Sequence, residues 1–351
     1  MKDHEIIDKA VETLTSISND IENAFYSKCN FSFNLHWNSN STPSAKSISH
    51  YPIESHEIII HYTLIIDIYR EIENLISHIN SSTDDYIIKD ILKEKIPEDP
   101  LASNSYTLDQ QIYNAFTAAI TWIYFHELSH LDQEHAYIRS QHSNHSCNII
   151  DELNINVSNK DNITNSEIYH LTELAADRSA SIICASELYR HFGDRNDEFK
   201  AMMKLFYLGI SCALYLFSKN NSFSISLPIS STHPIPIIRL EMFLTSVWET
   251  FSPVQEKAPY TDIGYERIEL INIASWVSTA TALYFNQKWK VGFDIKHLVN
   301  GTINRENGKE YLKILINTWH LVEPQLKSLQ HSKLEHLLLH FSDEYKKMIY
   351  E

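Results

Sequence analysis

The five residues 126–130, His-Glu-Leu-Ser-His, constrain the fold of this chain more than any other segment. Two histidines at positions i and i+4 lie on one face of an α-helix, so both imidazoles can reach a single metal ion. The glutamate between them lies beside that face, where its carboxylate can hold a proton of a metal-bound water. The pattern therefore requires a helix. It predicts a zinc site with His126 and His130 as ligands and Glu127 as general base and acid.

The residues before this motif favour the helix that it requires. Residues 107–125 contain no Gly or Pro, and their apolar side chains recur at helical spacing. Thr107, followed three residues later by Gln110, resembles a capping box at the start of a helix. We therefore predict one long helix from about Thr107 to about Arg139.

A zinc site that acts on a substrate needs a third protein ligand and an open fourth position. Residues 171–181 form another predicted helix, which places Glu173 and Asp177 four residues apart on one face. We predict Glu173 as the third ligand and Asp177 as the acceptor that orients a zinc-bound histidine. Two alanines, residues 175–176, favour the close packing of helices that this arrangement needs. The alternative is an exposed helix that carries acidic residues.

A later segment offers two hydrogen-bond donors. His233 precedes a proline, so its backbone is expected to be extended and to lie at the start of a helix. Arg239 follows about one and a half helical turns later. Both side chains are candidates to stabilise the oxyanion of a tetrahedral intermediate. A His-Pro pair alone means little, so their assignment depends on the rest of the site.

Other histidines and acids near the motif are interpreted as structural. His56 and His61 are five residues apart, and this spacing turns their rings away from each other on a helix and on a strand. His135 lies about two and a half turns after the first histidine of the motif, on the opposite side of the predicted helix. We predict a structural or surface role for it. Asp132 and Glu134 are predicted to belong to a solvated face.

The order of these segments resembles a family signature. His-Glu-x-x-His, then Glu-x-x-x-Asp, then Thr-His-Pro with a downstream arginine is similar to the gluzincin peptidases of the CAAX prenyl endopeptidase and HtpX type. The match covers roughly residues 107–245. The resemblance implies two histidines and a glutamate as zinc ligands, a glutamate as general base and acid, and a histidine that stabilises the transition state. By motif these roles fall, in that order, on His126, His130, Glu173, Glu127 and His233.

The chain departs from that family in its hydropathy. Most members are embedded in membranes, whereas the longest apolar run here, residues 205–217, is too short to span a bilayer. We therefore predict a soluble cytoplasmic relative. The soluble phage-exclusion peptidases of the Lit type are similar in size and also carry the His-Glu-x-x-His motif. That resemblance implies a triggered antiviral defence protease with an activating protein or peptide.

Composition limits the class of partner. The formal net charge is −16, and an acidic surface argues against binding to nucleic-acid backbones and to anionic membranes. A protein or peptide remains as the natural substrate. The four cysteines include no CxxC pair, so we expect no cysteine zinc site and predict free thiols in a reducing cytoplasm. Only 6 of 351 residues are glycine, which leaves no glycine-rich phosphate loop.

We predict a mainly α fold of the α+β class: a zincin-like helical core with a small edge sheet from the N-terminal third. Residues 31–37 alternate as a strand, 51–62 can supply a second one, and the Ser/Asn-rich residues 38–50 are predicted to form a loop. Residues 1–250 are expected to form the zincin-like metallopeptidase domain. Residues 260–351 are expected to form a helical region that caps it or recognises a partner, and this region can belong to the same domain.

Two hypotheses about function follow. The leading one is a soluble zinc-dependent endopeptidase that hydrolyses a peptide bond of a protein substrate. The alternative is a non-catalytic, all-helical binding or scaffold protein with an incidental or structural metal. An intact Glu127 argues against a purely structural metal, because a structural site needs no base there. The sequence leaves the oligomeric state and the identity of the substrate open.

Overall fold

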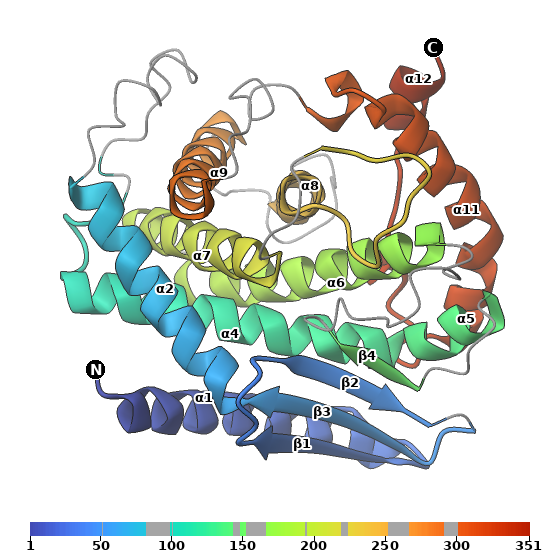
Figure 1. Ribbon diagram of the computed structural model, residues 1–351. Coiled ribbons are helices and arrows are strands. Elements are labelled where there is room, and N and C mark those ends of the chain that lie inside the picture. The colour runs from blue at the N-terminus through green and yellow to red at the C-terminus, as the bar shows by residue number, and fades with distance from the viewer. Residues whose placement is uncertain are drawn as a thin grey trace.

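The computed structural model confirms a mainly α fold with a small mixed sheet, drawn mostly from the N-terminal third. It describes residues 1–50, 52–81, 99, 101–142, 148–151, 166–193, 195–218, 224–251, 267–290 and 301–351. Figure 1 shows the arrangement in space: the sheet and α1 lie on one side of α4, and most of the remaining helices stack on the other side.

The N-terminal layer combines the sheet with one long helix. α1 (Asp3–Ala24) is followed by a short 3-10 turn, η1 (Tyr26–Lys28). The strands are β1 (Ser32–Asn38), β2 (Ala45–Ser49), β3 (Ser55–His61) and, later in the chain, β4 (Ile149–Asp151). Within the described residues their order across the sheet is β1-β3-β2-β4. β1 runs parallel to β3, while β2 is antiparallel to both β3 and β4.

Two predicted strands are confirmed, and one predicted loop is wrong in part. The alternation at 31–37 and within 51–62 corresponds to β1 and β3. The loop predicted at 38–50 contains β2. Its buried positions are filled by Ala45 and two serines. Such small side chains conceal the alternation from a search for large apolar residues.

The motif helix α4 (Leu108–Asp132) begins where its cap predicts. Thr107 Oγ1 accepts a hydrogen bond from the backbone N–H of Gln110 at 3.4 Å, and Gln110 Oε1 accepts one from the Thr107 N–H at 2.9 Å. The prediction of a single continuous helix is wrong at the C-terminal end, because the chain breaks after α4 and restarts as α5 (His135–His142). At the break Glu134 has a φ of 50°, a left-handed conformation that interrupts a helix.

Long helices pack around α4. They are α2 (Tyr62–Ser81), α6 (Ser166–Phe192), α7 (Asn196–Phe217), α8 (Pro236–Phe251) and α9 (Arg267–Trp289). α6 and α7 lie against α4, and α8 and α9 lie beyond them (Figure 1). α7 is long and apolar enough to cross a membrane, but 83% of its most apolar stretch is buried inside the protein. Burial in the core therefore accounts for its composition.

α7 and α4 cross at very short range. Gly209 of α7 faces the backbone of α4, where a Cβ added to it would lie 2.1 Å from the carbonyl oxygen of Ala115. No side chain larger than hydrogen fits at this crossing. The contact fixes α4 against the core about three turns before its histidines.

The C-terminal part of the chain closes the molecule on one side. It contains η2 (Thr302–Asn304), α11 (Gly308–Leu329), η3 (Glu335–Leu337) and α12 (Asp343–Tyr350). α11 packs against α5 and α6, and its Leu315 shares a buried apolar cluster with Leu171 and Leu174 of α6. Our division of the chain near residues 250–260 stays a prediction.

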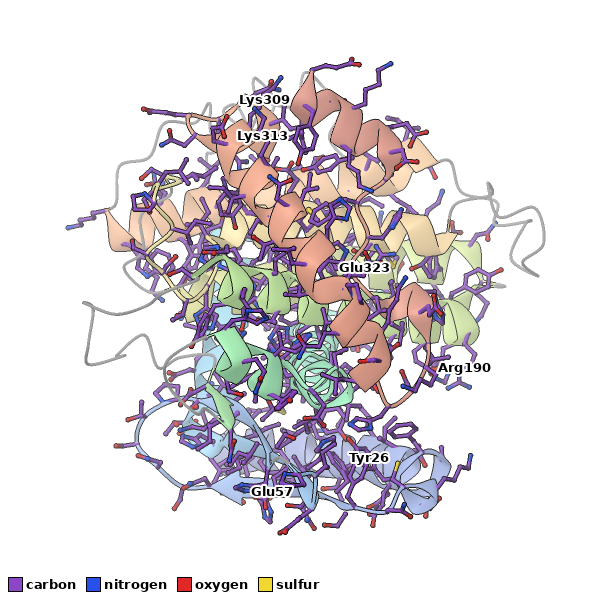
Figure 2. The ribbon with its side chains drawn as sticks, turned by 90° about the vertical axis from the view of Figure 1, so that its right-hand side faces the viewer. Tyr26, Glu57, Arg190, Lys309, Lys313 and Glu323 are labelled. Atoms are coloured by element: carbon purple, nitrogen blue, oxygen red, sulfur yellow. The ribbon has the colours of Figure 1, made fainter. Side chains whose placement is uncertain are left out.

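Figure 2 shows the course of the C-terminal part of the chain through the molecule. α11 runs from the end that carries Lys309 and Lys313, past Glu323, toward the N-terminal layer that contains Tyr26. The segment after α11 reaches the break between α4 and α5, where the backbone N–H of His331 donates to the Asp132 carbonyl at 2.9 Å. The C-terminal part of the chain therefore contacts the motif helix directly.

Candidate metal centre

Two helices far apart in sequence bring three metal-ligating side chains together. His126 and His130 extend from α4, and Glu173 extends from α6. The two Nε2 atoms are 3.0 Å apart; Glu173 Oε2 lies 3.4 Å from His126 Nε2, and Glu173 Oε1 lies 3.6 Å from His130 Nε2. All three ligand atoms lie within 4.8 Å of one another, and each residue is at most 1% exposed.

Close packing of α4 and α6 makes this convergence possible. Ala175 and Ala176, which lie between the two acids of α6, are fully buried. Trp122 of α4 donates from its indole nitrogen to Ser181 Oγ of α6 at 3.2 Å. The alternative prediction of an exposed acidic helix is wrong, because residues 166–185 of α6 are almost entirely buried.

Asp177 lies beside His126. Its Oδ1 is 2.9 Å from His126 Nδ1, and a proton on Nδ1 would leave the Nε2 lone pair facing the centre. Arg239 of α8 in turn holds this carboxylate: its Nε donates to Oδ2 at 2.8 Å and its Nη2 donates to Oδ1 at 2.7 Å. Arg239 is 1% exposed, so its charge is compensated inside the protein rather than by solvent.

A chain of hydrogen bonds determines the tautomer of His130. Gln133 Nε2 donates to Ser179 Oγ at 2.8 Å, and Ser179 donates to the carbonyl of Leu337 at 2.8 Å. The amide oxygen of Gln133 therefore faces His135, whose Nε2 lies 3.2 Å away and must carry the proton. His135 Nδ1 is then the acceptor for the Nδ1–H of His130, 2.8 Å away. The Nε2 lone pair of His130 consequently faces the centre.

His135 and its neighbours correct the sequence analysis. The prediction placed His135 on the opposite side of a continuous helix, but the break at residues 133–134 turns its ring back onto His130. His135 is fully buried, so a surface role is wrong. The predicted solvated face is also wrong: Glu134 is fully buried, and Asp132 accepts hydrogen bonds from the backbone N–H and hydroxyl of Ser332 at 2.7 and 2.8 Å.

The donor atoms of the centre suit a bound cation. Burial lowers the pKa of both His130 and His135 well below the usual range, so these rings are neutral. Two imidazole lone pairs and a carboxylate then point at one another. A tetrahedral zinc ion, about 2.0–2.2 Å from nitrogen and oxygen donors, separates them by roughly 3.3 Å. The observed separations of 3.0, 3.4 and 3.6 Å fit this requirement, although the donor set suits other divalent transition metals too.

A second arginine contacts the carboxylate ligand. Arg139 of α5 donates from Nη2 to Glu173 Oε1 at 2.6 Å and from Nε to Thr172 Oγ1 at 2.8 Å. Its guanidinium also lies over the ring of Tyr169, 4.9 Å from the centroid. The contact with Arg139 leaves Oε2 as the oxygen of Glu173 that is directed toward His126, at 3.4 Å.

The centre has one more accessible side. The side chain of His233 is 12% exposed, more than those of His126, His130 and Glu173, and its Nε2 lies 3.6 Å from Glu173 Oε1. Glu127, the remaining residue of the motif, is fully buried on α4. Among these side chains, that of His233 is therefore the one most open to solvent.

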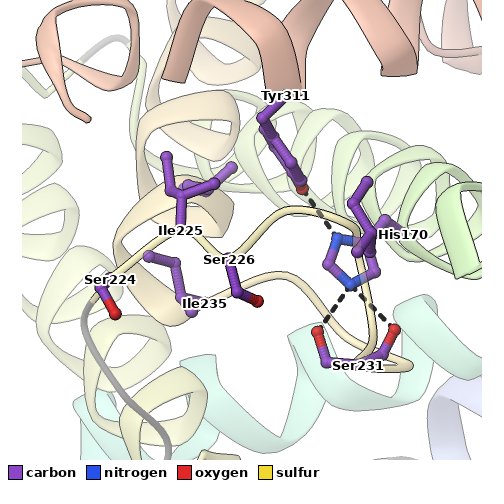
Figure 3. Close-up of a pocket in the computed structure, with 9 residues that line it drawn as sticks. His170, Ser224, Ile225, Ser226, Ser231, Ile235 and Tyr311 are labelled. Carbon is purple, nitrogen blue, oxygen red and sulfur yellow. Dashed lines mark hydrogen bonds between the residues drawn. The ribbon is translucent and has the colours of Figure 1, made fainter. Parts of the chain in front are cut away.

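The segment that carries His233 is anchored to α6 and α11. His170 of α6 contacts Tyr311 Oη of α11 through Nδ1 at 2.8 Å and Ser231 Oγ through Nε2 at 2.9 Å (Figure 3). Burial lowers the pKa of His170 to about 3, so its ring is neutral and takes part through hydrogen bonds alone. Ile225 and Ile235 line the same small pocket beside it. This anchoring sets the position of His233 relative to the metal ligands.

The structure thus brings together six of the seven residues that the sequence analysis selected: His126, His130, Glu173, Asp177, His233 and Arg239. The seventh, Glu127, is buried on the same helix as the two histidines. It adds three that no pattern predicted to contact the centre, namely Gln133, His135 and Arg139. All three lie at or after the helix break, and the prediction of a continuous helix places them on other faces of that helix.

Comparison with known proteins finds no relative. No protein-family model, no curated protein and no solved structure matches this chain. The function therefore has to be inferred from the geometry of the centre.

Proposed function

We propose that this protein is a zinc-dependent endopeptidase that hydrolyses a peptide bond of a protein or peptide substrate. One observation supports this above all: the Nε2 atoms of two histidines lie within 3.6 Å of the carboxylate of Glu173, next to a buried glutamate of the same motif. Bound zinc would supply Lewis-acid activation of water and of the scissile carbonyl. The ligands would be His126, His130 and Glu173.

Other side chains would handle the proton and the developing charge. Glu127 accepts the proton of the attacking water and passes it to the leaving amine. His233 lies on the accessible side, 3.6 Å from Glu173, and is the candidate donor to the oxyanion. Arg239, which the sequence analysis also assigned to the oxyanion, is better explained as a positioning residue, because it donates two hydrogen bonds to Asp177.

Glu127→Gln tests the proposal. The substitution keeps the size of the side chain but removes its capacity to move a proton. We expect metal content to stay unchanged while hydrolysis falls by a factor of about 10² to 10⁴, the usual contribution of general acid–base catalysis. The measurements are metal analysis of the purified protein and a proteome-wide comparison of cleavage products between wild type and variant.

The control for this experiment is Glu22→Gln, which makes the same chemical change at an exposed position of α1. It should cleave as the wild type does. Full activity in the Glu127→Gln protein would refute the role of Glu127, and wild-type protein without any metal would refute the centre itself.

Deep burial of the centre supports regulated activity. His126, Glu127 and Glu173 are at most 1% exposed, so substrate access requires movement of the residues around His233. We infer a cytoplasmic protease that an activating protein or peptide switches on, consistent with an antiviral defence role. An acidic chain with a net charge of −16 favours a protein partner over nucleic acid or an anionic membrane.

The same burial favours one other function, a binding or scaffold protein with a structural metal. The scaffold and the protease predict different results for the Glu127→Gln substitution. In the scaffold, Glu127→Gln changes neither metal content nor partner binding, and no cleavage product appears with any substrate. In the protease, a partner that triggers activity yields wild-type products that the variant does not make.

A further inference from the structure

A second group of ligand-type side chains lies outside this centre. His56 of β3, Glu134 at the break between α4 and α5, and His331 after α11 converge from three separate segments. His56 Nε2 and His331 Nε2 each lie 2.8 Å from the same oxygen, Glu134 Oε1. All three ligand atoms lie within 4.8 Å of one another.

Neighbouring side chains orient two of these groups. Tyr26, in the N-terminal layer of Figure 2, contacts His56 Nδ1 through its hydroxyl at 2.9 Å. Ser49 of β2 donates to the other carboxylate oxygen of Glu134 at 2.7 Å. Such outer contacts, which fix ring orientation and leave one ligand atom pointing inward, typically accompany metal ligands.

The surroundings of Glu134 also favour a cation. Within the described residues neither Lys nor Arg forms an ion pair with Glu134, although its side chain is fully buried. Buried charges are usually paired or bound to metal ions.

We propose that His56, Glu134 and His331 form a second site for a divalent transition metal, with a structural role. Two imidazoles and one carboxylate suit zinc and its neighbours rather than calcium or magnesium, which prefer oxygen. The 2.8 Å contacts of Glu134 Oε1 with the two Nε2 atoms are shorter than the roughly 3.3 Å between ligand atoms of a tetrahedral ion, so a bound ion would separate the side chains by roughly half an ångström. The side chain of His331 is 17% exposed, so water can complete the coordination from that side.

The site would tie three distant parts of the chain together. β3 belongs to the sheet, Glu134 belongs to the break that positions His135, and His331 belongs to the C-terminal segment. It is independent of the first centre in its ligands and involves none of His126, His130 or Glu173. Its metal would therefore add stability without taking part in hydrolysis.

Cobalt titration of the full-length apoprotein tests this inference. We expect two equivalents of Co²⁺ to bind wild type and one equivalent to bind His331→Ala, detected by visible absorption and by metal analysis after dialysis. His336→Ala, which removes an exposed histidine of η3, is the matched control and should still bind two. An unchanged number of equivalents in His331→Ala would overturn the site and assign the cluster to hydrogen bonding alone.

A variant of the first centre separates the two proposals. His126→Ala/His130→Ala should retain one zinc per chain, held by the second site, even if the protein is not a protease. Loss of all zinc from this variant, with an unchanged circular dichroism spectrum, would also overturn the second site. If the double variant does not fold, the comparison of wild type with His331→Ala still decides, because both chains keep the first centre intact.

Discussion

The tautomer of His130 depends on a residue outside the His-Glu-x-x-His motif. In many metal sites a carboxylate or carbonyl accepts the second ring proton of the ligating histidine. Here the carboxylate of Asp177 lies 2.9 Å from His126 Nδ1, whereas the neutral ring of His135, backed by Gln133, accepts from His130. The two candidate ligands thus have neighbours of different charge, and the electrostatic stabilisation of His130 is the weaker one.

His135→Ala should therefore weaken metal binding rather than abolish it. Without an acceptor, the Nδ1–H of His130 is left unsatisfied in a fully buried position, and the other tautomer turns a proton toward the metal. We expect a loss of affinity of about 10- to 100-fold, as for other outer contacts of metal ligands. Competition with a zinc chelator measures it. The exposed His320→Ala is the control, and equal affinities for both variants would contradict the role.

Among the helices, α7 crosses α4 at very short range. Ala115 and Gly209 approach so closely that the backbone of one helix occupies the space of a side chain on the other. Helix α4 bears both histidine ligands, so any displacement at the crossing changes their distance from Glu173 on α6.

Gly209→Ala should destabilise the protein even though alanine favours helices. The added Cβ would lie 2.1 Å from the Ala115 carbonyl oxygen, which belongs to a backbone that cannot rotate away. We expect a net loss of about 1–3 kcal/mol in the free energy of unfolding, because overpacking outweighs the gain in helix propensity. Urea denaturation measures this. Gly301→Ala, where the nearest atom is a side-chain oxygen at 3.4 Å, should be nearly neutral.

On the scale of the whole molecule, the segment after α11 joins the sheet to the helical core. Its backbone carbonyls at Leu337 and Leu338 accept hydrogen bonds from Ser179 Oγ at 2.8 Å and from Arg178 Nε at 2.7 Å. Both donors lie on α6, within two turns of Glu173. The C-terminal segment therefore supports the centre from outside.

Truncation after Leu329 should remove the connection that this segment makes between the sheet and the helical core. The buried Arg178 and Ser179 lose their acceptors, which costs about 1–3 kcal/mol for each unsatisfied group. We expect a lower midpoint of thermal unfolding together with weaker metal binding. A chain that ends at Ser342 keeps both carbonyls and lacks only α12, so it should behave more like the full chain. Identical midpoints for the two truncations would contradict this role.

Local patterns in the sequence predicted part of this structure. The capping box at Thr107 and the spacing of Glu173 and Asp177 depend on contacts within one or two helical turns, and such contacts can be recognised without a fold. The approach of α4 to α6 was also predictable, because two adjacent alanines lie between the acids. These features were sufficient to select the three candidate ligands.

The helix break at Glu134 could not be predicted in this way. It depends on contacts of Asp132 with Ser332 and of Glu134 with His56, residues far away in sequence. Helix propensity does not predict this break, since residues 131–135 include neither glycine nor proline. The prediction of a continuous helix therefore placed every later residue of the segment, including His135, on the wrong side of α4. Long-range contacts thus decided the part of the centre that local reasoning missed.

The acceptor at Leu337 has a consequence for biosynthesis. Synthesis of α4 and α6 precedes that of residues 331–338, so the nascent chain contains His130 before it contains the carbonyl that anchors Ser179 and, through Ser179, Gln133 and His135. Full affinity for a metal at this centre should therefore develop only after residues 331–338 have left the ribosome.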